Sequence, residues 1–189
     1  MYCASNPGRD PAFAAAAAEL GALLADRRIG VVYGGGSVGL MGVLADSVLA
    51  AGGDIIGVIP HHLEDREVGH AGLTEKHVVA SMHERKQLMA DLADGFVALP
   101  GGFGTLEEVF EVLTWSQLGL HRKPIGLLDV AEFYTPLLAF LDHAVDVGLL
   151  RPQHRASIVP IDGVADVIEA LEAWSPPPDL PKWIERPPR

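Results

Sequence analysis

The feature that most constrains the fold is the stretch 95–108, Gly-Phe-Val-Ala-Leu-Pro-Gly-Gly-Phe-Gly-Thr-Leu-Glu-Glu. An apolar run stops at a proline, enters a glycine cluster and continues as a helical pattern, which predicts a strand, a tight loop and a helix N-terminus. Gly101, Gly102 and Gly104 permit positive φ and let a ligand approach the backbone. Because the first N–H groups of a helix that begins near Thr105 have no intrahelical partner, we expect this loop to bind a phosphate.

Two glutamates enter the first turn of the same helix. Glu107 and Glu108 bring carboxylates close to the expected anion site, which suits chemistry on a phosphorylated sugar. The spacing Thr105-x-x-Glu108 also fits a capping box, in which Thr105 caps the helix and Glu108 bonds back to the backbone. The spacing alone leaves both catalysis and capping open for Glu108.

Apolar runs and helical patterns alternate along the rest of the chain. Strands are predicted at 29–33, 54–60, 76–80, 95–99, 124–128 and 157–161, and the run 29–33 is apolar without alternation, as expected for a strand covered on both faces. Helical patterns lie at 11–26, from the second glycine loop to 51, and at 82–93, 105–118, 133–147 and 164–174. Residues 1–5 resemble the last residues of a strand whose beginning is missing or very short. The alternation predicts an α/β fold with a doubly wound, Rossmann-like, mostly parallel sheet and helices on both faces.

Length and charge limit the domain count and the partners. A chain of 189 residues predicts one domain, which we expect over 1–174. Residues 175–189 hold six of the fourteen prolines and are expected to form an extended tail. The net charge of −11 leaves no broad basic surface, so a nucleic-acid partner is not expected and an anionic ligand must be bound locally.

Cysteine and histidine usage argues against structural metals. The single cysteine, Cys3, excludes an internal disulfide and a cysteine-based zinc site, and it favours a reducing compartment, for which the cytoplasm is the simplest expectation. The alanine-rich stretch 12–25 contains Glu19 and lacks a basic n-region, so we interpret it as an ordinary helix and expect no membrane anchor. No metal is predicted at the histidines His61, His62, His70 and His77.

A second glycine loop, Gly34-x-Gly36-x-x-Gly39, fits the dinucleotide fingerprint weakly. Asp54 lies twenty positions after Gly34, but it opens the next strand, whereas the acid that binds ribose should close it. No Gly-Lys-Ser or Gly-Lys-Thr follows either glycine loop, and no Gly-x-Ser-x-Gly is present. P-loop ATP hydrolysis and serine acyl chemistry therefore have little support.

One arginine occupies a position that a solvated side chain does not need. Leu88, Met89 and Leu92 mark the expected buried side of their helix, and Arg85 shares that side at its N-terminal end. Arg85, Glu108 and the two glycine loops are all expected near the carboxyl ends of the strands. Together they are suited to holding a nucleoside monophosphate and cleaving it near its ribose.

The helix 105–118 carries two apolar stripes. We expect one stripe to cover the sheet, at Leu106, Val109, Phe110 and Leu113. The other, at Val112 and Trp115, lies on nearly the opposite side together with Glu108. That stripe needs a partner, either a second subunit or another element of the same chain, and we predict a homodimer from it.

At this point the residues resemble a known family. Pro100-Gly-Gly-Phe-Gly-Thr-Leu-Glu-Glu108 fits the PGGxGTxxE signature of the lonely-guy (LOG) proteins, the cytokinin riboside 5′-monophosphate phosphoribohydrolases that are often labelled lysine decarboxylases. The resemblance covers nearly the whole chain and includes Cys3-Ala-Ser, Tyr33-Gly-Gly-Gly-Ser-Val-Gly-Leu-Met-Gly42, Met82-His-Glu-Arg-Lys86 and Thr114-Trp-Ser-Gln-Leu-Gly119. The family's usual Cys-Gly-Ser-Ser is Cys-Ala-Ser-Asn in this chain.

The resemblance implies a reaction and a set of site residues. The reaction is hydrolysis of the N-glycosidic bond of an N6-modified adenosine 5′-monophosphate, with Arg85 and Glu108 as catalytic residues and no cofactor. The implied nucleotide contacts are Glu67, Lys86, Gly102, Phe103, Gly104, Thr105, Leu106, Glu107 and Thr114. The glycine loops and the first loop add the candidate substrate contacts Ser5, Gly35, Gly36 and Gly101.

Three other functions were weighed against this hydrolase. The lysine decarboxylase label is rejected because the chain is short for a pyridoxal-phosphate enzyme and shows no lysine in a recognisable cofactor motif. A less selective nucleosidase acting on AMP is an alternative enzyme. A nucleotide or molybdenum-cofactor carrier is an alternative from another class, and the joint presence of Arg85 and Glu108 favours an enzyme over it.

Overall fold

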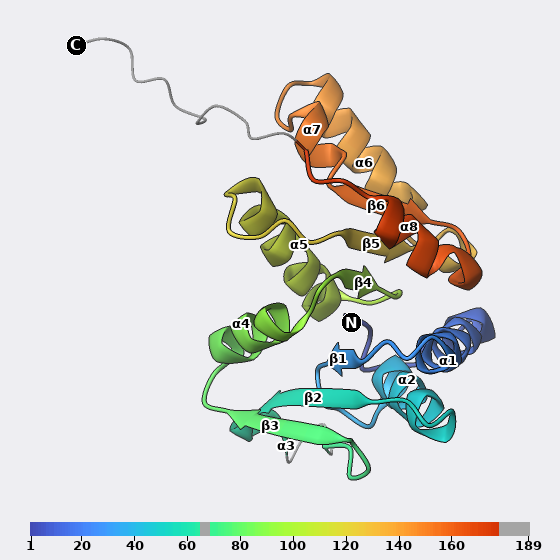
Figure 1. The fold of residues 1–189 in the computed structure, drawn as a ribbon. Coiled ribbons are helices and arrows are strands. Elements are labelled where there is room, and N and C mark those ends of the chain that lie inside the picture. The colour runs from blue at the N-terminus through green and yellow to red at the C-terminus, as the bar shows by residue number, and fades with distance from the viewer. Residues whose placement is uncertain (65–68, 178–189) are drawn as a thin grey trace.

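The computed structural model describes residues 1–64 and 69–177, which form two parallel three-stranded sheets (Figure 1). The first sheet has the order β1-β2-β3, and the second has the order β4-β5-β6. The strands are β1 (Val31–Tyr33), β2 (Ile55–Pro60), β3 (Glu75–Val79), β4 (Phe96–Ala98), β5 (Ile125–Leu128) and β6 (Ile158–Ile161). All are short, and all but β3 are apolar, as expected for strands covered on both faces, whereas the edge strand β3 begins with the exposed residues Glu75 and Lys76.

The first residues of the chain join the two sheets. Tyr2 forms a parallel bridge with Ala98, in which the Tyr2 amide donates to the Val97 carbonyl and the Tyr2 carbonyl accepts from the Leu99 amide, both at 2.9 Å. On the other side, the Met1 nitrogen donates to a β1 carbonyl at 2.6 Å. Strand order therefore runs outward in both directions from residues 1–3, which lie between β1 and β4 in Figure 1. Such a switch point is where doubly wound folds bind ligands.

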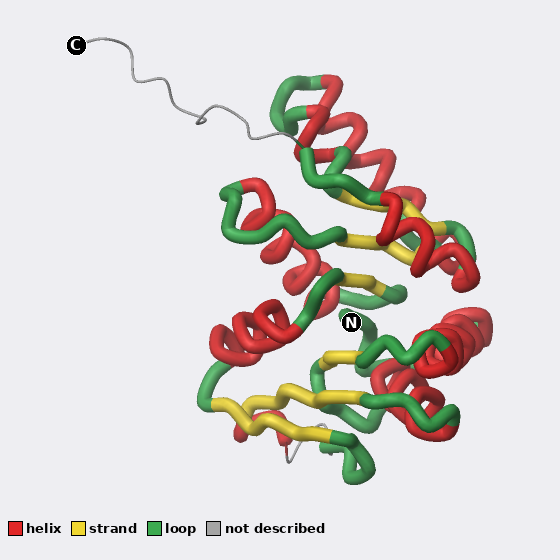
Figure 2. The backbone as a smooth tube through the Cα atoms, viewed as in Figure 1, coloured by secondary structure: helices red, strands yellow, loops and turns green. Residues whose placement is uncertain are grey.

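Helices cover both faces of the joined sheets (Figure 2). One face is covered by α1 (Pro11–Asp26), α2 (Gly39–Ala50) and α8 (Val167–Ala173), and the other by α4 (Met82–Leu92), α5 (Phe103–Gln117) and α6 (Thr135–Asp146). Short helices lie at α3 (His61–Glu64), η1 (Val130–Glu132), α7 (Pro152–Arg155) and η2 (Val164–Asp166). No helix in the described part of the chain is long and apolar enough to cross a membrane.

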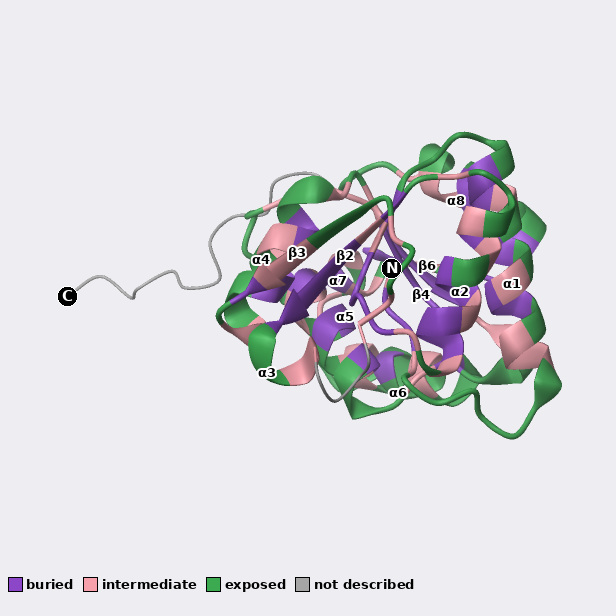
Figure 3. Cartoon of the chain, turned by 90° about the horizontal axis from the view of Figure 1, so that it is seen from below, coloured by how far each residue is buried: buried purple, intermediate pink, exposed green. Residues whose placement is uncertain are grey.

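The core has two halves because successive strand residues point to opposite faces. Val97 and Leu99 pack with α1, α2 and α8, whereas Phe96 and Ala98 pack with α4, α5 and α6. Figure 3 shows the buried residues along the strands and on the inner sides of the helices. The predicted doubly wound α/β fold is confirmed.

Most element boundaries fall within a few residues of the expected ones, but three expectations were wrong. Helix α5 begins at Phe103, so Thr105 lies inside the helix and Gly102 is its N-cap residue. Leu92, expected on the buried side of α4, is 41% exposed. The predicted helix 164–174 divides into η2 and α8. The proposed domain limit at 174 stays a prediction, and residues 178–189 of the tail lie outside the described residues.

The buried side of α5 takes residues from both predicted stripes, since Val109 of the first and Val112 of the second both lie in the core. The buried side of α5 consists of Thr105, Glu108, Val109 and Val112, whereas Phe110 is 37% exposed. The prediction that Val112 needs a partner subunit was therefore wrong, because it packs in the core of its own chain. Because Thr105 and Glu108 are polar, the pattern of apolar residues did not reveal the buried side of α5.

The contact between α1 and α2 depends on a residue without a side chain, and this generates the first prediction. A Cβ added at Gly21 would lie 2.9 Å from both the Leu44 carbonyl oxygen and the Ser47 Cβ. We expect Gly21→Val to lower the free energy of unfolding by about 1–3 kcal/mol through overpacking. The exposed neighbour Ala22 provides the control, since Ala22→Val should cost about 0.5 kcal/mol through helix propensity alone. Urea unfolding followed by circular dichroism measures both, and equal losses would contradict the packing argument.

Candidate active site

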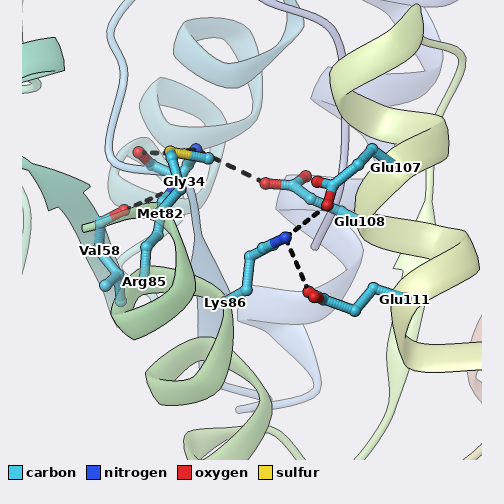
Figure 4. Close-up of polar contacts among 8 residues, drawn as sticks. All are labelled: Gly34, Val58, Met82, Arg85, Lys86, Glu107, Glu108 and Glu111. Carbon is cyan, nitrogen blue, oxygen red and sulfur yellow. Dashed lines mark hydrogen bonds and ion pairs between the residues drawn. The ribbon is translucent and has the colours of Figure 1, made fainter. Parts of the chain in front are cut away.

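Arg85 is held in place by backbone carbonyls from two strands. It lies in the first turn of α4, which begins after Ser81. Its Nε donates to the Val58 carbonyl at 3.0 Å and its Nη2 donates to the Gly34 carbonyl at 3.2 Å (Figure 4). The Met82 sulfur lies 3.8 Å from Nη1. With only 6% of its surface exposed, the guanidinium has a fixed position.

That position requires glycine at the end of β1. A Cβ at Gly34 would lie 1.8 Å from Nη2 of Arg85 and 3.1 Å from its Cζ. Any larger residue would have to displace the guanidinium, so the first glycine of the Gly34–Gly36 loop makes room for a charged side chain. This differs from the dinucleotide fingerprint, in which the glycines make room for the ligand.

Glu108 faces Arg85 from the other half of the fold. Its Oε1 lies 3.6 Å from Nη1 of Arg85, and Glu108 is 8% exposed. Burial raises the pKa of the Glu108 carboxyl, and the neighbouring Arg85 guanidinium opposes part of that shift. The pair therefore combines a fixed cation with a carboxylate whose proton affinity is increased.

A cavity of about 290 Å³ lies over this pair at the switch point of the sheet. The residues that line it come from the first loop, the second glycine loop and its helix, α4, and the start of α5. They are Met1, Cys3, Ala4, Ser5, Asn6, Gly34, Met41, Arg85, Gly102, Phe103, Gly104, Thr105 and Glu108. Burial raises the pKa of the Cys3 thiol to about 12, so it is not a nucleophile at neutral pH.

The N-terminus of α5 forms one wall of the cavity. Gly102 is extended at the N-cap position, and no side chain among the described residues caps the helix there. The Leu106 amide is bonded to the Gly102 carbonyl, which leaves the three preceding helical amides without intrahelical acceptors. A Cβ at Gly101 would lie 2.1 Å from Oγ1 of Thr105, so glycine at 101 lets the loop close on the helix. An uncapped helix start beside a cavity suits an anion.

Comparison with known proteins identifies the family. A family model described as possible lysine decarboxylase matches residues 41–171. The cytokinin riboside 5′-monophosphate phosphoribohydrolase LOG7 of Arabidopsis thaliana is 48% identical over 176 residues, which are 93% of this chain and 81% of the relative. The chain belongs to the LOG family. The cytokinin riboside 5′-monophosphate phosphoribohydrolase of Rhodococcoides fascians is 46% identical over 174 residues, which are 92% of this chain and 88% of that relative.

A solved structure from another functional class has the same architecture. The molybdenum cofactor carrier protein of Chlamydomonas reinhardtii matches with a TM-score of 0.64 at 23% identity, covering 90% of this chain and 94% of its own. At this identity the likeness shows the fold alone. The chemistry of this LOG-family member must therefore be argued from its side chains.

The structure gathers some of the predicted substrate contacts and separates others. Five of them line the cavity: Ser5, Gly102, Phe103, Gly104 and Thr105. The residues Gly35, Gly36, Gly101, Leu106, Glu107 and Thr114 are not among those that line it. Thr114 is exposed, and its hydroxyl donates to the Phe110 carbonyl at 2.7 Å. Glu67 lies outside the described residues.

Lys86 is oriented differently from Arg85. Its ammonium bonds the Glu107 carboxylate and lies 3.0 Å from Oε2 of Glu111. Burial alone would lower the pKa of Lys86, but these two carboxylates outweigh it and raise the pKa. Lys86 is 6% exposed and is not among the residues that line the cavity.

Several lining residues were missed by the sequence analysis. Gly34 enters the sequence-based prediction only as part of the dinucleotide fingerprint, and Asn6 and Met41 lie in the family motifs without being predicted as site residues. Gly34 could have been found from its place directly after an apolar strand, where a backbone carbonyl is available to bind a buried cation. Asn6 and Met41 carry no local signal, because only the fold brings them together.

The capping alternative for Glu108 does not fit this geometry. Thr105 is the third residue of α5 and therefore cannot be the N-cap residue of a capping box. Glu108 pairs with Arg85 instead. Of the two readings left open by the spacing, the structure supports a role in the cavity.

The raised pKa of Glu108 generates the second prediction. The carboxyl binds its proton more tightly in the folded chain than in the unfolded chain, so its contribution to stability falls as pH rises above the ordinary value of 4.5. Glu108→Gln removes that loss. We therefore expect the Tm of Glu108→Gln, relative to the wild type, to be higher at about pH 7.5 than at about pH 4.

Glu19 on the exposed side of α1 supplies the control for this prediction. Glu19→Gln should show no such dependence on pH, because the side chain is exposed. Differential scanning calorimetry of the three proteins gives the comparison. A Tm difference for Glu108→Gln that decreases as pH rises would contradict the assigned direction of the pKa shift.

Proposed function

We propose that this protein hydrolyses the N-glycosidic bond of N6-modified adenosine 5′-monophosphates and releases the free cytokinin base and ribose 5-phosphate. The observation that carries the proposal is the buried Arg85–Glu108 pair, 3.6 Å apart, in a cavity bordered by an uncapped helix N-terminus. Relatives that are 46–48% identical and are named cytokinin riboside 5′-monophosphate phosphoribohydrolases support it.

The start of α5 is the proposed phosphate site. The backbone amides of Phe103, Gly104 and Thr105 carry the positive end of the helix dipole, and Gly102 allows close approach of a ligand. Glu108 follows one turn later on the same helix. A phosphate bound at the helix start would therefore orient the attached ribose toward Glu108, which lowers the entropic cost of reaching the transition state.

Glu108 is the proposed catalytic carboxylate. When the bond to the base breaks, its electron pair goes to the purine nitrogen and positive charge develops on the ribose ring. A buried carboxylate on that side stabilises the charge and accepts a proton as the water oxygen bonds to the anomeric carbon. The raised pKa brings Glu108 closer to the operating pH, which strengthens it as a base.

Arg85 supplies a fixed positive charge. Its guanidinium does not release a proton at neutral pH, so it cannot act as the general acid. Its bonds to Val58 and Gly34 hold it beside Glu108. We assign it to binding the phosphate or ribose and to opposing excessive protonation of Glu108.

The first test of this function, and the third prediction, compares substrates and variants. Release of base should be fast from isopentenyladenosine 5′-monophosphate, and kcat/KM should be much lower for isopentenyladenosine, which lacks the phosphate. Glu108→Gln should lower kcat by roughly 100-fold or more, because it removes the charge that the transition state needs. Arg85→Ala should lower kcat/KM similarly and also weaken nucleotide binding.

Chromatographic assay of base and ribose 5-phosphate measures these outcomes and separates the alternative functions. Equal kcat/KM for AMP and its prenylated analogue would assign a general nucleosidase. Tight nucleotide binding without release of base would assign a carrier. Near-full turnover by Glu108→Gln would remove Glu108 from the mechanism. The cytoplasmic location stays a prediction that this assay does not address.

We also propose a homodimer, on a different surface of α5 from the one expected from the sequence. The exposed side of α5 and the segment after it carry apolar side chains at Phe103, Phe110, Leu118 and Leu120, which are 94%, 37%, 67% and 70% exposed. Burying these side chains against a second copy would contribute on the order of a few kcal/mol. Because Phe103 also borders the cavity, the partner would lie close to the active site.

The homodimer is the fourth prediction. Light scattering at micromolar concentration should give twice the mass of the chain, and the double variant Phe110→Glu/Leu120→Glu should give the mass of a monomer. Phe140 on α6 is 62% exposed and serves as the control, since Phe140→Glu should remain dimeric. A monomeric wild type would contradict the dimer, and a monomeric Phe140→Glu would place the interface elsewhere.

A further inference from the structure

The two members of the catalytic pair belong to different halves of the fold. Arg85 is carried by α4, which packs against β1, β2 and β3. Glu108 is carried by α5, which packs against β5 in the other sheet. In the described part of the chain, the backbone pairing between the two sheets runs through residues 1–3. Met89 of α4 also packs in one core cluster with Val109 and Val112 of α5. The separation of Arg85 and Glu108 therefore depends on how firmly α4 is held against α5.

A second ion pair crosses from α4 to α5 directly beside the first. Lys86 follows Arg85 on α4, and Glu107 precedes Glu108 on α5. Glu111 lies one turn beyond Glu107 on the same side of α5. In Figure 4 the Lys86 ammonium lies between the Glu107 and Glu111 carboxylates, while Arg85 points toward Glu108. The Arg85–Glu108 and Lys86–Glu111 ion pairs therefore lie next to each other between the same two helices.

We infer that Lys86 is a positioning residue, which holds α4 against α5 through Glu107 and Glu111 and so sets the distance between Arg85 and Glu108. The inference deepens the proposed function and rests on it. It replaces the sequence-based expectation that Lys86 contacts the nucleotide. A long flexible ammonium suits this role, because it is a compact charge that can be shared between two carboxylates.

The surroundings of Lys86 argue against a direct contact with phosphate. Its ammonium is engaged by two carboxylates, and the side chain is 8% exposed. Turning it toward the cavity would leave Glu111 without its cation, although Oε2 of Glu111 is buried and has no other hydrogen-bond partner within the described residues. Leaving a buried carboxylate oxygen unpaired is costly. The cavity already has Arg85 and the start of α5 to bind an anion.

Glu111→Gln gives the sharpest test, and its outcome is the fifth prediction. It weakens one contact of Lys86 and keeps the lysine charge, and Glu111 is not a residue of the cavity. We expect kcat for isopentenyladenosine 5′-monophosphate to fall by about fivefold with KM within about twofold of the wild type. Lys86→Met should lower kcat by about tenfold or more, also with little change in KM.

A measurement without substrate separates loosened helices from a direct charge effect. The charged groups that shift the pKa of Glu108 are Arg85, the α-amino group of Met1, Glu107 and Lys86. Removing the negative charge of Glu111 would by itself lower the pKa of Glu108 or leave it unchanged. Loosening α4 from α5 would move Arg85 away and raise that pKa. We therefore expect carbon-13 NMR of the Glu108 carboxyl to give a higher pKa in Glu111→Gln than in the wild type.

Lys123→Met is the matched control. Lys123 Nζ donates to the Ala90 carbonyl at 2.7 Å, so this lysine also contacts α4, but near its other end. The variant should keep kcat, KM and the pKa of Glu108. Two results would overturn the inference: a rise in KM of about tenfold for Lys86→Met with kcat unchanged, or a fall of the Glu108 pKa in Glu111→Gln. If the wild type releases no base, the proposed function fails, while the NMR titration still tests the positioning role.

Discussion

The structure of the site depends on bringing a buried guanidinium next to a buried carboxylate. A charged group removed from water is stable only when its hydrogen bonds are replaced, so Arg85 takes carbonyls from β2 and from the loop after β1. The resulting position of the guanidinium requires glycine at position 34. The shape of the second glycine loop is therefore a consequence of where Arg85 must be.

Glu108 shows how the site gains reactivity at the expense of stability. Its burial raises the free energy of its ionised form, and the nearby Arg85 offsets this only partly. A carboxylate in that condition destabilises the folded chain at neutral pH, but it binds a proton or a developing positive charge more strongly. Thr105 and Glu108 occupy the sheet side of α5, where apolar residues would pack better.

The polar residues on the sheet side of α5 also explain which parts of the structure were predictable from the sequence. Apolar runs and glycines at the loops were enough to predict the strands, most helices and the glycine loop before α5, since these depend on local chemistry. The phosphate site at that loop stays a prediction. The orientation of α5 was not, because its sheet side contains two polar residues and its exposed side contains Phe110. The position of Lys86 was also missed. Its partners lie 21 residues or more away in sequence, and nothing local distinguishes a bridging lysine from one that binds phosphate.

The fold alone does not determine what the site between the two sheets does. A carrier protein with a TM-score of 0.64 shares the architecture, so the strand order and the helix layers do not by themselves produce hydrolysis. In this chain, Arg85 and Glu108 come from opposite halves of the fold, and the ion pair between Lys86 and Glu111 links the same two helices beside them. In the proposed function, the helix start of α5 binds the phosphate, and this feature belongs to one half of the fold. The proposed bond cleavage also needs Arg85 and Glu108 at a fixed separation, and on this proposal the contact between α4 and α5 is part of the catalytic apparatus.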